Sequence, residues 1–215
     1  MKEMTNENLI KELIDDGYLK SPSIIKAFRK IDRLNFIPGI YKDEAYGNYP
    51  LSIGRNQTIS QPLTVAFMLE LLEPKAGEKI LDVGCGSGWQ TALLAEIIGD
   101  PAVAGGMVIG IERINELKNL AENNILKFGF IEKGIVKIIE GDGTKGYEAD
   151  APYDKIIAAA AGEIIPKAWK EQLKIGGRIV APVKESIIIL DKLSPSDFSQ
   201  RQYFGFSFVP LVEGK

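Results

Sequence analysis

A glycine-rich stretch in the middle of the chain constrains the fold more than any other feature of the sequence. It spans residues 81–89 and reads Leu-Asp-Val-Gly-Cys-Gly-Ser-Gly-Trp. A short apolar run precedes the glycines, and a helical apolar pattern over residues 91–98 follows directly. Glycine lets a ligand approach the backbone closely, and a helix N-terminus offers free N–H groups. The order of strand, glycine turn and helix therefore predicts a cradle for a cofactor.

The spacing of the glycines indicates which cofactor this is. Dinucleotide-binding folds need a third small residue so that helix and strand pack closely, but Trp89 occupies that position here. The chain instead has an acid followed by three alternating glycines, namely Asp82, Gly84, Gly86 and Gly88. This pattern resembles the first motif of class I methyltransferases, which implies that these residues bind S-adenosylmethionine, with Asp82 meeting a cationic group. An ordinary glycine turn between strand and helix is the alternative.

Composition narrows the class of protein. The 215 residues, 45% hydrophobic and 26% charged, are typical of one globular domain. A formal net charge of -3 provides no overall attraction for nucleic acid, and no apolar run reaches the length of a membrane span. The single cysteine, Cys85, permits no internal disulfide, so we expect a cytoplasmic protein. The chain contains no histidine, the commonest general base and metal ligand, so we expect no metal site.

The chain is predicted to form a single domain over residues 1–215. Residues 1–62 are expected to supply N-terminal helices, at about 6–16 and 22–31, together with a substrate-binding loop. Residues 63–215 are expected to form the cofactor-binding core. The helical period disappears between residues 36 and 61, a segment too long to be a simple connector and rich in aromatic residues. We therefore assign that segment a functional role.

Strand-like and helical segments alternate after residue 62, which predicts a Rossmann-like, doubly wound α/β fold. Its mostly parallel sheet has seven strands, and helices cover both faces. The C-terminus departs from this alternation, because residues 186–193 and 201–209 look like two antiparallel strands joined by a turn at 194–197. The expected strands are 80–83, 107–111, 135–139, 155–159, 177–182, 186–193 and 201–209. The expected helices of the core are 65–72, 89–98, 113–128 and 163–173.

Two more strand ends carry residues that suit the same cofactor. Glu112 ends the second strand of the core, where a Rossmann-like unit places an acid to accept hydrogen bonds from ribose hydroxyls. Asp142 and Gly143 follow the third strand, where an acid can reach an adenine amino group. A solvated carboxylate in the first turn of a helix and an ordinary turn are the respective alternatives. The coincidence of such residues on consecutive strand ends favours the cofactor interpretation.

The irregular segment indicates the methyl acceptor. Residues 54–62, which include Thr58-Ile59-Ser60, closely resemble the signature of protein-L-isoaspartate (D-aspartate) O-methyltransferases. The likeness continues at 141–143, 151–154, 173–178 and 208–211. It implies methyl transfer from S-adenosylmethionine to the α-carboxylate of L-isoaspartyl residues in damaged proteins, which starts repair through a succinimide. D-aspartyl residues are a second acceptor class that the resemblance leaves open, and it does not determine the oligomeric state.

The resemblance also implies roles for individual residues. Ser60 corresponds to the active-site serine of the family, and we expect its hydroxyl to orient the acceptor carboxylate. Its alternative role is that of a turn or helix-capping serine ahead of Pro62. The expected substrate-binding residues are Gln57, Thr58, Ile59, Val209 and Pro210.

The reaction suits a chain without histidine. A carboxylate has a pKa near 4 and is ionised at neutral pH, so its methylation needs no general base. A class I methyltransferase that acts on a small molecule is the nearest alternative, and one that acts on RNA would be expected to show a basic patch. A cofactor-binding module without catalysis and a nicotinamide oxidoreductase fit the residues less well.

Overall fold

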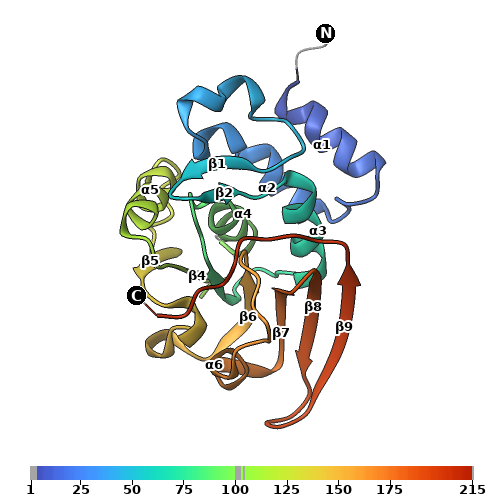
Figure 1. Ribbon diagram of the computed structural model, residues 1–215, viewed down its shortest axis with the longest axis vertical. Coiled ribbons are helices and arrows are strands. Elements are labelled where there is room, and N and C mark those ends of the chain that lie inside the picture. The colour runs from blue at the N-terminus through green and yellow to red at the C-terminus, as the bar shows by residue number, and fades with distance from the viewer. Residues whose placement is uncertain (1–3, 100–102, 104, 215) are drawn as a thin grey trace.

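The computed structural model describes residues 4–99, 103 and 105–214 and consists of a twisted central sheet with helices packed against it (Figure 1). The helices are α1 (Asn6–Asp15), α2 (Pro22–Lys30), α3 (Pro62–Leu72), α4 (Trp89–Ile98), α5 (Asn115–Leu126) and α6 (Lys167–Gln172). The strands of the central sheet are β3 (Lys79–Val83), β4 (Met107–Glu112), β5 (Val136–Glu140), β6 (Tyr153–Ala158), β7 (Leu173–Val183), β8 (Ser186–Lys192) and β9 (Phe198–Phe204). Short 3-10 helices are η1 (Arg33–Phe36), η2 (Gly39–Glu44), η3 (Gly143–Lys145) and η4 (Glu148–Asp150).

The order of the strands confirms the predicted Rossmann-like fold. The sheet has seven strands in the order β5-β4-β3-β6-β7-β8-β9. Strand β3 pairs in parallel with β4 on one side and with β6 on the other, so the direction of winding reverses between β3 and β6. In open α/β sheets ligands bind at the carboxyl ends of the strands beside such a reversal. The glycine turn follows β3 at that point.

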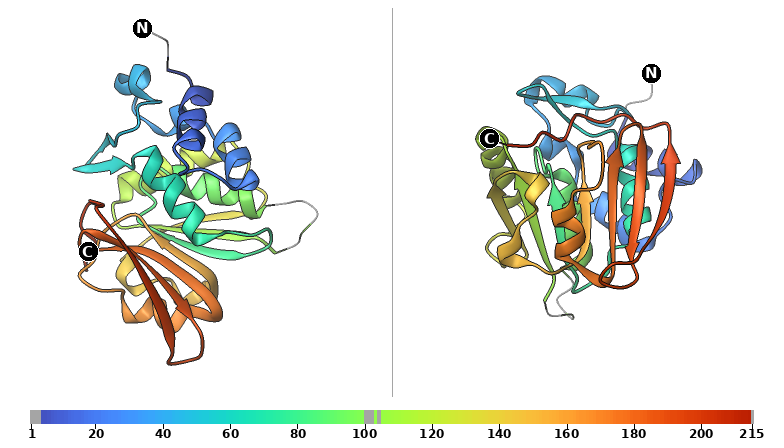
Figure 2. Two further views of the ribbon diagram at one scale, coloured as in Figure 1. Left: turned by 90° about the vertical axis from the view of Figure 1, so that its right-hand side faces the viewer. Right: turned by 60° about the horizontal axis from the view of Figure 1, so that its bottom comes forward.

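The N-terminal helices and the sheet share one apolar core. A continuous cluster of buried side chains joins α1 and α2 to α3, α4, α5 and one face of the sheet. Phe28 of α2 packs edge-on against Trp89, the first residue of α4, with ring centroids 5.5 Å apart. The other face is covered around α6 by a second cluster that includes Trp169 and Tyr153. Figure 2 shows α1 and α2 lying above the sheet, outside the core helices.

The C-terminal hairpin forms, but its second strand is displaced from the predicted range. Strand β9 pairs antiparallel with β8 from Phe198 opposite Lys192 to Phe204 opposite Ser186. The pairing stops where β8 begins, and Gly205, with φ of +92°, turns the chain away. Residues 205–209 therefore leave the sheet and enter a tail that crosses the carboxyl ends of the parallel strands (Figure 1). The strand that opposes the others in direction is β8, because β9 reverses direction once more.

The segment from residue 36 to 61 contains a hairpin that the sequence pattern did not predict. Strand β1 (Leu51–Gly54) pairs antiparallel with β2 (Gln57–Ile59). Arg55 and Asn56 connect them with φ of 54° and 57°, as a two-residue hairpin turn requires. Strands of three or four residues with an irregular register leave too little alternation for sequence reasoning to detect.

Two predicted helices are shorter than expected. Helix α5 begins at Asn115, and α6 extends only over Lys167–Gln172 because Pro166 is its N-cap. No helix within the described residues is long and apolar enough to cross a membrane.

Candidate functional site

A cavity lies over the carboxyl ends of β3, β4 and β6, at the reversal of strand order. It encloses about 690 Å³ of empty space, part of it open to solvent. The predicted site residues in its lining are Gln57, Thr58, Gly84, Gly86, Glu112, Gly143, Val209 and Pro210. The structure thus brings residues from the hairpin, the glycine turn, two further strand ends and the C-terminal tail to one cavity.

The glycine turn forms the floor of this cavity with backbone that other residues rarely adopt. Gly84 and Gly86 have φ of +76° and +55°. A Cβ atom on Gly86 would lie 3.2 Å from Ile53 Cδ1, so the hairpin approaches the turn closely. The hydroxyl of Ser87 in the same turn is buried and has no hydrogen-bond partner within the described residues. Ser87 does not line this cavity, so a ligand there would meet the backbone of Gly84 and Gly86.

Glu112 is buried at the end of β4 and faces both the turn and the cavity. One carboxylate oxygen accepts a hydrogen bond from the Gly86 N–H at 3.1 Å, and the other accepts one from the Ile114 N–H at 3.0 Å. Each oxygen keeps a further lone pair, so the carboxylate can still accept from two ligand hydroxyls. The geometry suits the predicted ribose contact, and it gives Glu112 a second task, that of holding the glycine turn.

Asp82 does not line the cavity. It is fully buried, and its two oxygens accept hydrogen bonds from Gln90 Nε2 at 2.7 Å and from Thr91 Oγ1 at 2.6 Å. Burial raises the pKa of Asp82 to about 6, which these hydrogen bonds only partly oppose. We therefore assign Asp82 to anchoring the first turn of α4 beside the glycine turn, and its contact with a cationic group stays a prediction.

Replacement of Asp82 separates these two roles. We expect Asp82→Asn to keep the fold and to change the Kd for S-adenosylmethionine less than threefold, because the amide can accept from Gln90 and donate to Thr91. Asp82→Ala leaves both partners unpaired and should cost about 3 kcal/mol of unfolding free energy. Calorimetric titration and chemical denaturation measure the two quantities. A tenfold loss of affinity in a folded Asp82→Asn protein would instead support a direct contact between Asp82 and the cofactor.

The unfolding free energy of Asp82→Asn, measured as a function of pH, gives a second test of this role. The folded-state pKa of Asp82 lies above its ordinary value of 3.8, so the native state binds this proton more tightly than the unfolded state. The cost of burying the charge is present above pH 6 and disappears as the pH falls toward 4. We expect Asp82→Asn to be more stable than the wild type at pH 7 and to lose that advantage by pH 4.

Gly88 also lies outside the cavity lining. Its φ is +91°, and a Cβ atom there would lie 3.2 Å from Ala121 Cα on α5. The third glycine of the motif therefore allows α4 and α5 to pack closely, which makes its contribution to a ligand site indirect.

Asp142 is engaged by the chain itself, whereas its neighbour Gly143 reaches the cavity. The Asp142 carboxylate accepts from the Thr144 N–H at 2.9 Å, from Thr144 Oγ1 at 2.6 Å and from the Gly214 N–H at 3.0 Å. Burial alone would raise the pKa of Asp142, but these hydrogen bonds and Lys145 outweigh it and hold the pKa below its usual value. The C-terminal tail is thus fastened at the edge of the cavity.

A second cavity of about 710 Å³ opens between the hairpin and the tail. Its lining contains Ser60 and no charged side chain, and consists of Pro50, Thr58, Ser60, Gln61, Thr64, Ala159, Ser207, Phe208 and Val209. The N-cap of α3 is Gln61 and not Ser60. Within the described residues the Ser60 hydroxyl has no hydrogen-bond partner, so a capping role does not account for it.

The two cavities meet at Thr58, Ala159 and Val209, which line both of them. A small connecting space between them is lined by Ile59 and Ser60 on one side and by the glycine turn on the other. Ala159, Ser207 and Phe208 were not among the predicted site residues, and only the course of the tail places Ser207 and Phe208 here. No group of three or more His, Cys, Asp and Glu side chains able to hold a metal occurs in the described part of the chain.

Comparisons with known proteins agree with this geometry. A family model described as protein-L-isoaspartate(D-aspartate) O-methyltransferase matches residues 4–215. A Methanopyrus kandleri protein named protein-L-isoaspartate O-methyltransferase is 41% identical over 210 residues, which cover 96% of this chain and 90% of the relative. A protein of the same name from Ignicoccus hospitalis is 41% identical over 217 residues, 99% of each chain.

Solved structures show the same fold. A crystal structure assigned to a Plasmodium falciparum protein-L-isoaspartate O-methyltransferase, in complex with S-adenosyl-L-homocysteine, superposes with a TM-score of 0.87. It is 24% identical and the match covers 97% of this chain and 99% of that one.

Proposed function

The chain belongs to the protein-L-isoaspartate(D-aspartate) O-methyltransferase family, and from this premise we propose how it transfers a methyl group from S-adenosylmethionine to isoaspartyl residues of damaged proteins. The junction of the two cavities carries the proposal. The cavity over the glycine turn would hold the cofactor, and the cavity beside Ser60 would hold the acceptor. Thr58 and Ala159 belong to both linings, so the reacting groups would meet between them.

The cofactor would be held mainly by backbone and by one acid. Gly84, Gly86 and Gly143 let it approach the chain closely, and Glu112 would accept hydrogen bonds from its ribose hydroxyls. Bound S-adenosylmethionine supplies an electrophilic methyl group on a sulfonium. Pro210 and its neighbours in the tail would cover the cavity and exclude water.

The acceptor cavity suits a substrate that is already a nucleophile. An isoaspartyl carboxylate is ionised at neutral pH, so its methylation moves no proton and needs no base. Neutral hydroxyls line this cavity, and no lysine or arginine does. A cationic side chain would bind the charged carboxylate more tightly than the neutral ester that the reaction produces. A group that is bound equally or better in the ground state does not lower the barrier. We assign the Ser60 hydroxyl to orienting the carboxylate, and Gln57, Thr58 and Ile59 to the adjoining wall.

The tail forms the opposite wall and offers backbone to a peptide. Ala161 already pairs with the Val209 carbonyl and the Leu211 N–H, both at 2.8 Å. An extended peptide would therefore pair with the other edge of the tail.

The wider organisation belongs to the same proposal. Residues 1–62 would serve as the acceptor-binding part, and residues 63–215 as the cofactor-binding core, of a single domain. The buried thiol of Cys85, the single cysteine of the sequence, forms no disulfide, which supports a reducing, cytoplasmic location.

The direct test measures methyl transfer from labelled S-adenosylmethionine to a peptide with one L-isoaspartyl residue. The same peptide with normal aspartate is the control. We expect label only in the isoaspartyl peptide. Cofactor binding without transfer to isoaspartate would contradict the acceptor and redirect the search to small molecules.

A further inference from the structure

Arg33, the first residue of η1, is fully buried. Among the described residues its hydrogen bonds all go to backbone carbonyls, and its Nε has no partner. Its Nη1 donates to the carbonyls of Ala45 at 2.9 Å and Gly47 at 3.1 Å. Its Nη2 donates to the carbonyls of Tyr49 at 2.9 Å and Ser60 at 3.2 Å. Within the described residues no carboxylate forms an ion pair with Arg33, so these four carbonyls hold its charge.

The four carbonyls lie at both ends of the β1–β2 hairpin. Ala45, Gly47 and Tyr49 precede β1, whereas Ser60 follows β2. One planar guanidinium therefore fixes the start and the end of the segment that carries the predicted acceptor residues. Hydrogen bonds reduce the cost of a buried charge, and here Nη1 and Nη2 make all of them, so each carbonyl that moves away leaves part of that cost uncompensated. This couples the four positions to one another.

Arg33 also connects the hairpin to the cofactor cradle. Its guanidinium lies 5.5 Å from the ring centroid of Trp89, the residue that follows the glycine turn. The indole Nε1 of Trp89 donates to the carbonyl of Ile31 at 3.2 Å, which holds the ring in place. Trp89 and Ser60 line the same small connecting space. The arginine is thus packed between the two halves of the site and touches neither cavity.

We propose that Arg33 is a positioning residue, which places Ser60 relative to the cofactor cradle through the four backbone carbonyls and thereby determines activity toward isoaspartyl acceptors. This inference rests on the proposed function. Burial lowers the pKa of Arg33 to about 10, so the guanidinium is still charged at neutral pH. A lysine supplies one point donor and cannot reproduce the planar fork of donors.

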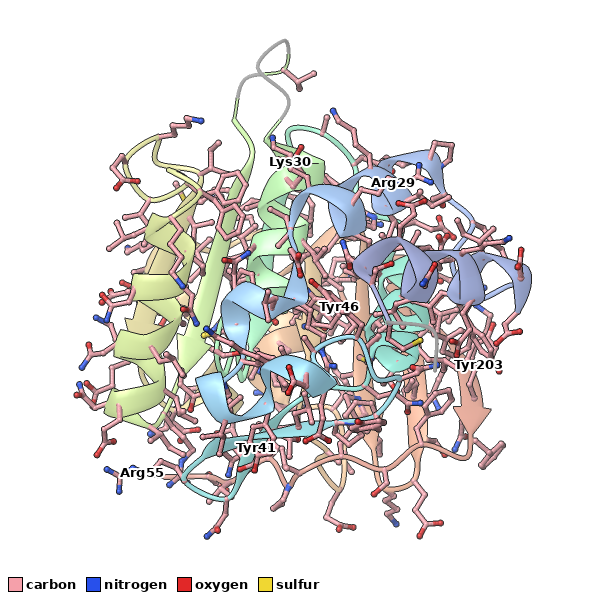
Figure 3. The ribbon with its side chains drawn as sticks, turned by 90° about the horizontal axis from the view of Figure 1, so that it is seen from above. Arg29, Lys30, Tyr41, Tyr46, Arg55 and Tyr203 are labelled. Atoms are coloured by element: carbon pink, nitrogen blue, oxygen red, sulfur yellow. The ribbon has the colours of Figure 1, made fainter. Side chains whose placement is uncertain are left out.

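The test compares Arg33→Lys and Arg33→Met with the wild type. We expect kcat/KM for an isoaspartyl peptide to fall about thirtyfold in Arg33→Lys and more in Arg33→Met, while the Kd for S-adenosylmethionine changes less than threefold. Arg29→Met is the matched control, because Arg29 lies on α2 away from the hairpin (Figure 3) and its ion pair with Glu7 is exposed. It should keep wild-type kinetics. Should Arg33→Met not fold, Arg33→Lys is sufficient for the comparison.

Two further measurements distinguish positioning from general stability. In a Ser60→Ala background, Arg33→Lys should lower the residual kcat by no more than threefold, because the group that it positions is already absent. Amide hydrogens of residues 45–60 should exchange at least tenfold faster in Arg33→Lys, with exchange in α4 unchanged. Equal losses of cofactor affinity and peptide turnover, or additive effects of the two substitutions, would overturn the proposal. A wild-type protein that does not methylate isoaspartyl peptide would instead reject the proposed function.

Discussion

Ser60→Ala is expected to lower kcat for an isoaspartyl peptide by about 100-fold to 1,000-fold, the range found when one oriented hydrogen-bond donor is removed from an active site. The Ser60 hydroxyl has no hydrogen-bond partner within the described residues and lines the cavity that joins the glycine turn. Its loss should therefore cost orientation of the acceptor and little stability. Initial rates with labelled S-adenosylmethionine measure kcat, and thermal unfolding checks the fold.

Ser52→Ala is the matched control for this prediction. Ser52 lies in the same hairpin, but it lines neither cavity, and its hydroxyl accepts a hydrogen bond from the Gly54 N–H at 3.3 Å. We expect wild-type kinetics from it. The Kd for S-adenosylmethionine should be unchanged in both variants. A Ser60→Ala enzyme with more than a third of wild-type kcat would remove the serine from the mechanism and leave Thr58 as the next candidate.

Glu112→Gln is expected to weaken S-adenosylmethionine binding about 100-fold, equivalent to about 2.7 kcal/mol. The carboxylate of Glu112 accepts from the N–H groups of Gly86 and Ile114, one on each oxygen. An amide has one oxygen, so its NH2 group must face one of these N–H donors. The substitution should displace the glycine turn and also remove an acceptor for a ribose hydroxyl. Calorimetric titration with S-adenosylmethionine measures the change.

Glu140→Gln provides the comparison for Glu112→Gln. Glu140 pairs in register with Glu112 at the end of β5, bonds Asn115 Nδ2 at 2.6 Å and does not line the cavity. We expect its variant to bind S-adenosylmethionine as the wild type does. Equal affinities in the Glu112 and Glu140 variants would mean that the cofactor does not bind over β4.

The hairpin tip illustrates how distant parts of the chain complete the site. Arg55 stands at the end of the hairpin (Figure 3) and pairs with Glu116 of α5 at 2.5 Å. Both side chains are more than half exposed, so this pair contributes little to stability. It nevertheless joins the hairpin tip to the first turn of α5, outside the lining of the cavity.

The sequence by itself determined the fold class, and it predicted the cofactor cradle and the serine that orients the acceptor. These inferences rest on local features of the sequence. The period of the apolar residues indicates strand or helix, and the motif from Asp82 to Gly88 is contained within seven residues. The third glycine was assigned to the ligand for the same reason, although only the packing of Ala121 against it shows its structural role.

Only the tertiary structure decided which acids line the cavity and which side chain binds the carbonyl of Ser60. Asp82, Glu112 and Asp142 look alike as carboxylates at strand ends, but burial and the available N–H and O–H donors give each a different set of partners. Arg33 carries no local signal, because the carbonyls that it binds lie 12 to 27 residues further along the chain. The physical reason is common to both cases: a polar side chain acts through the groups that the fold brings to it, and those contacts are not encoded in its immediate neighbours.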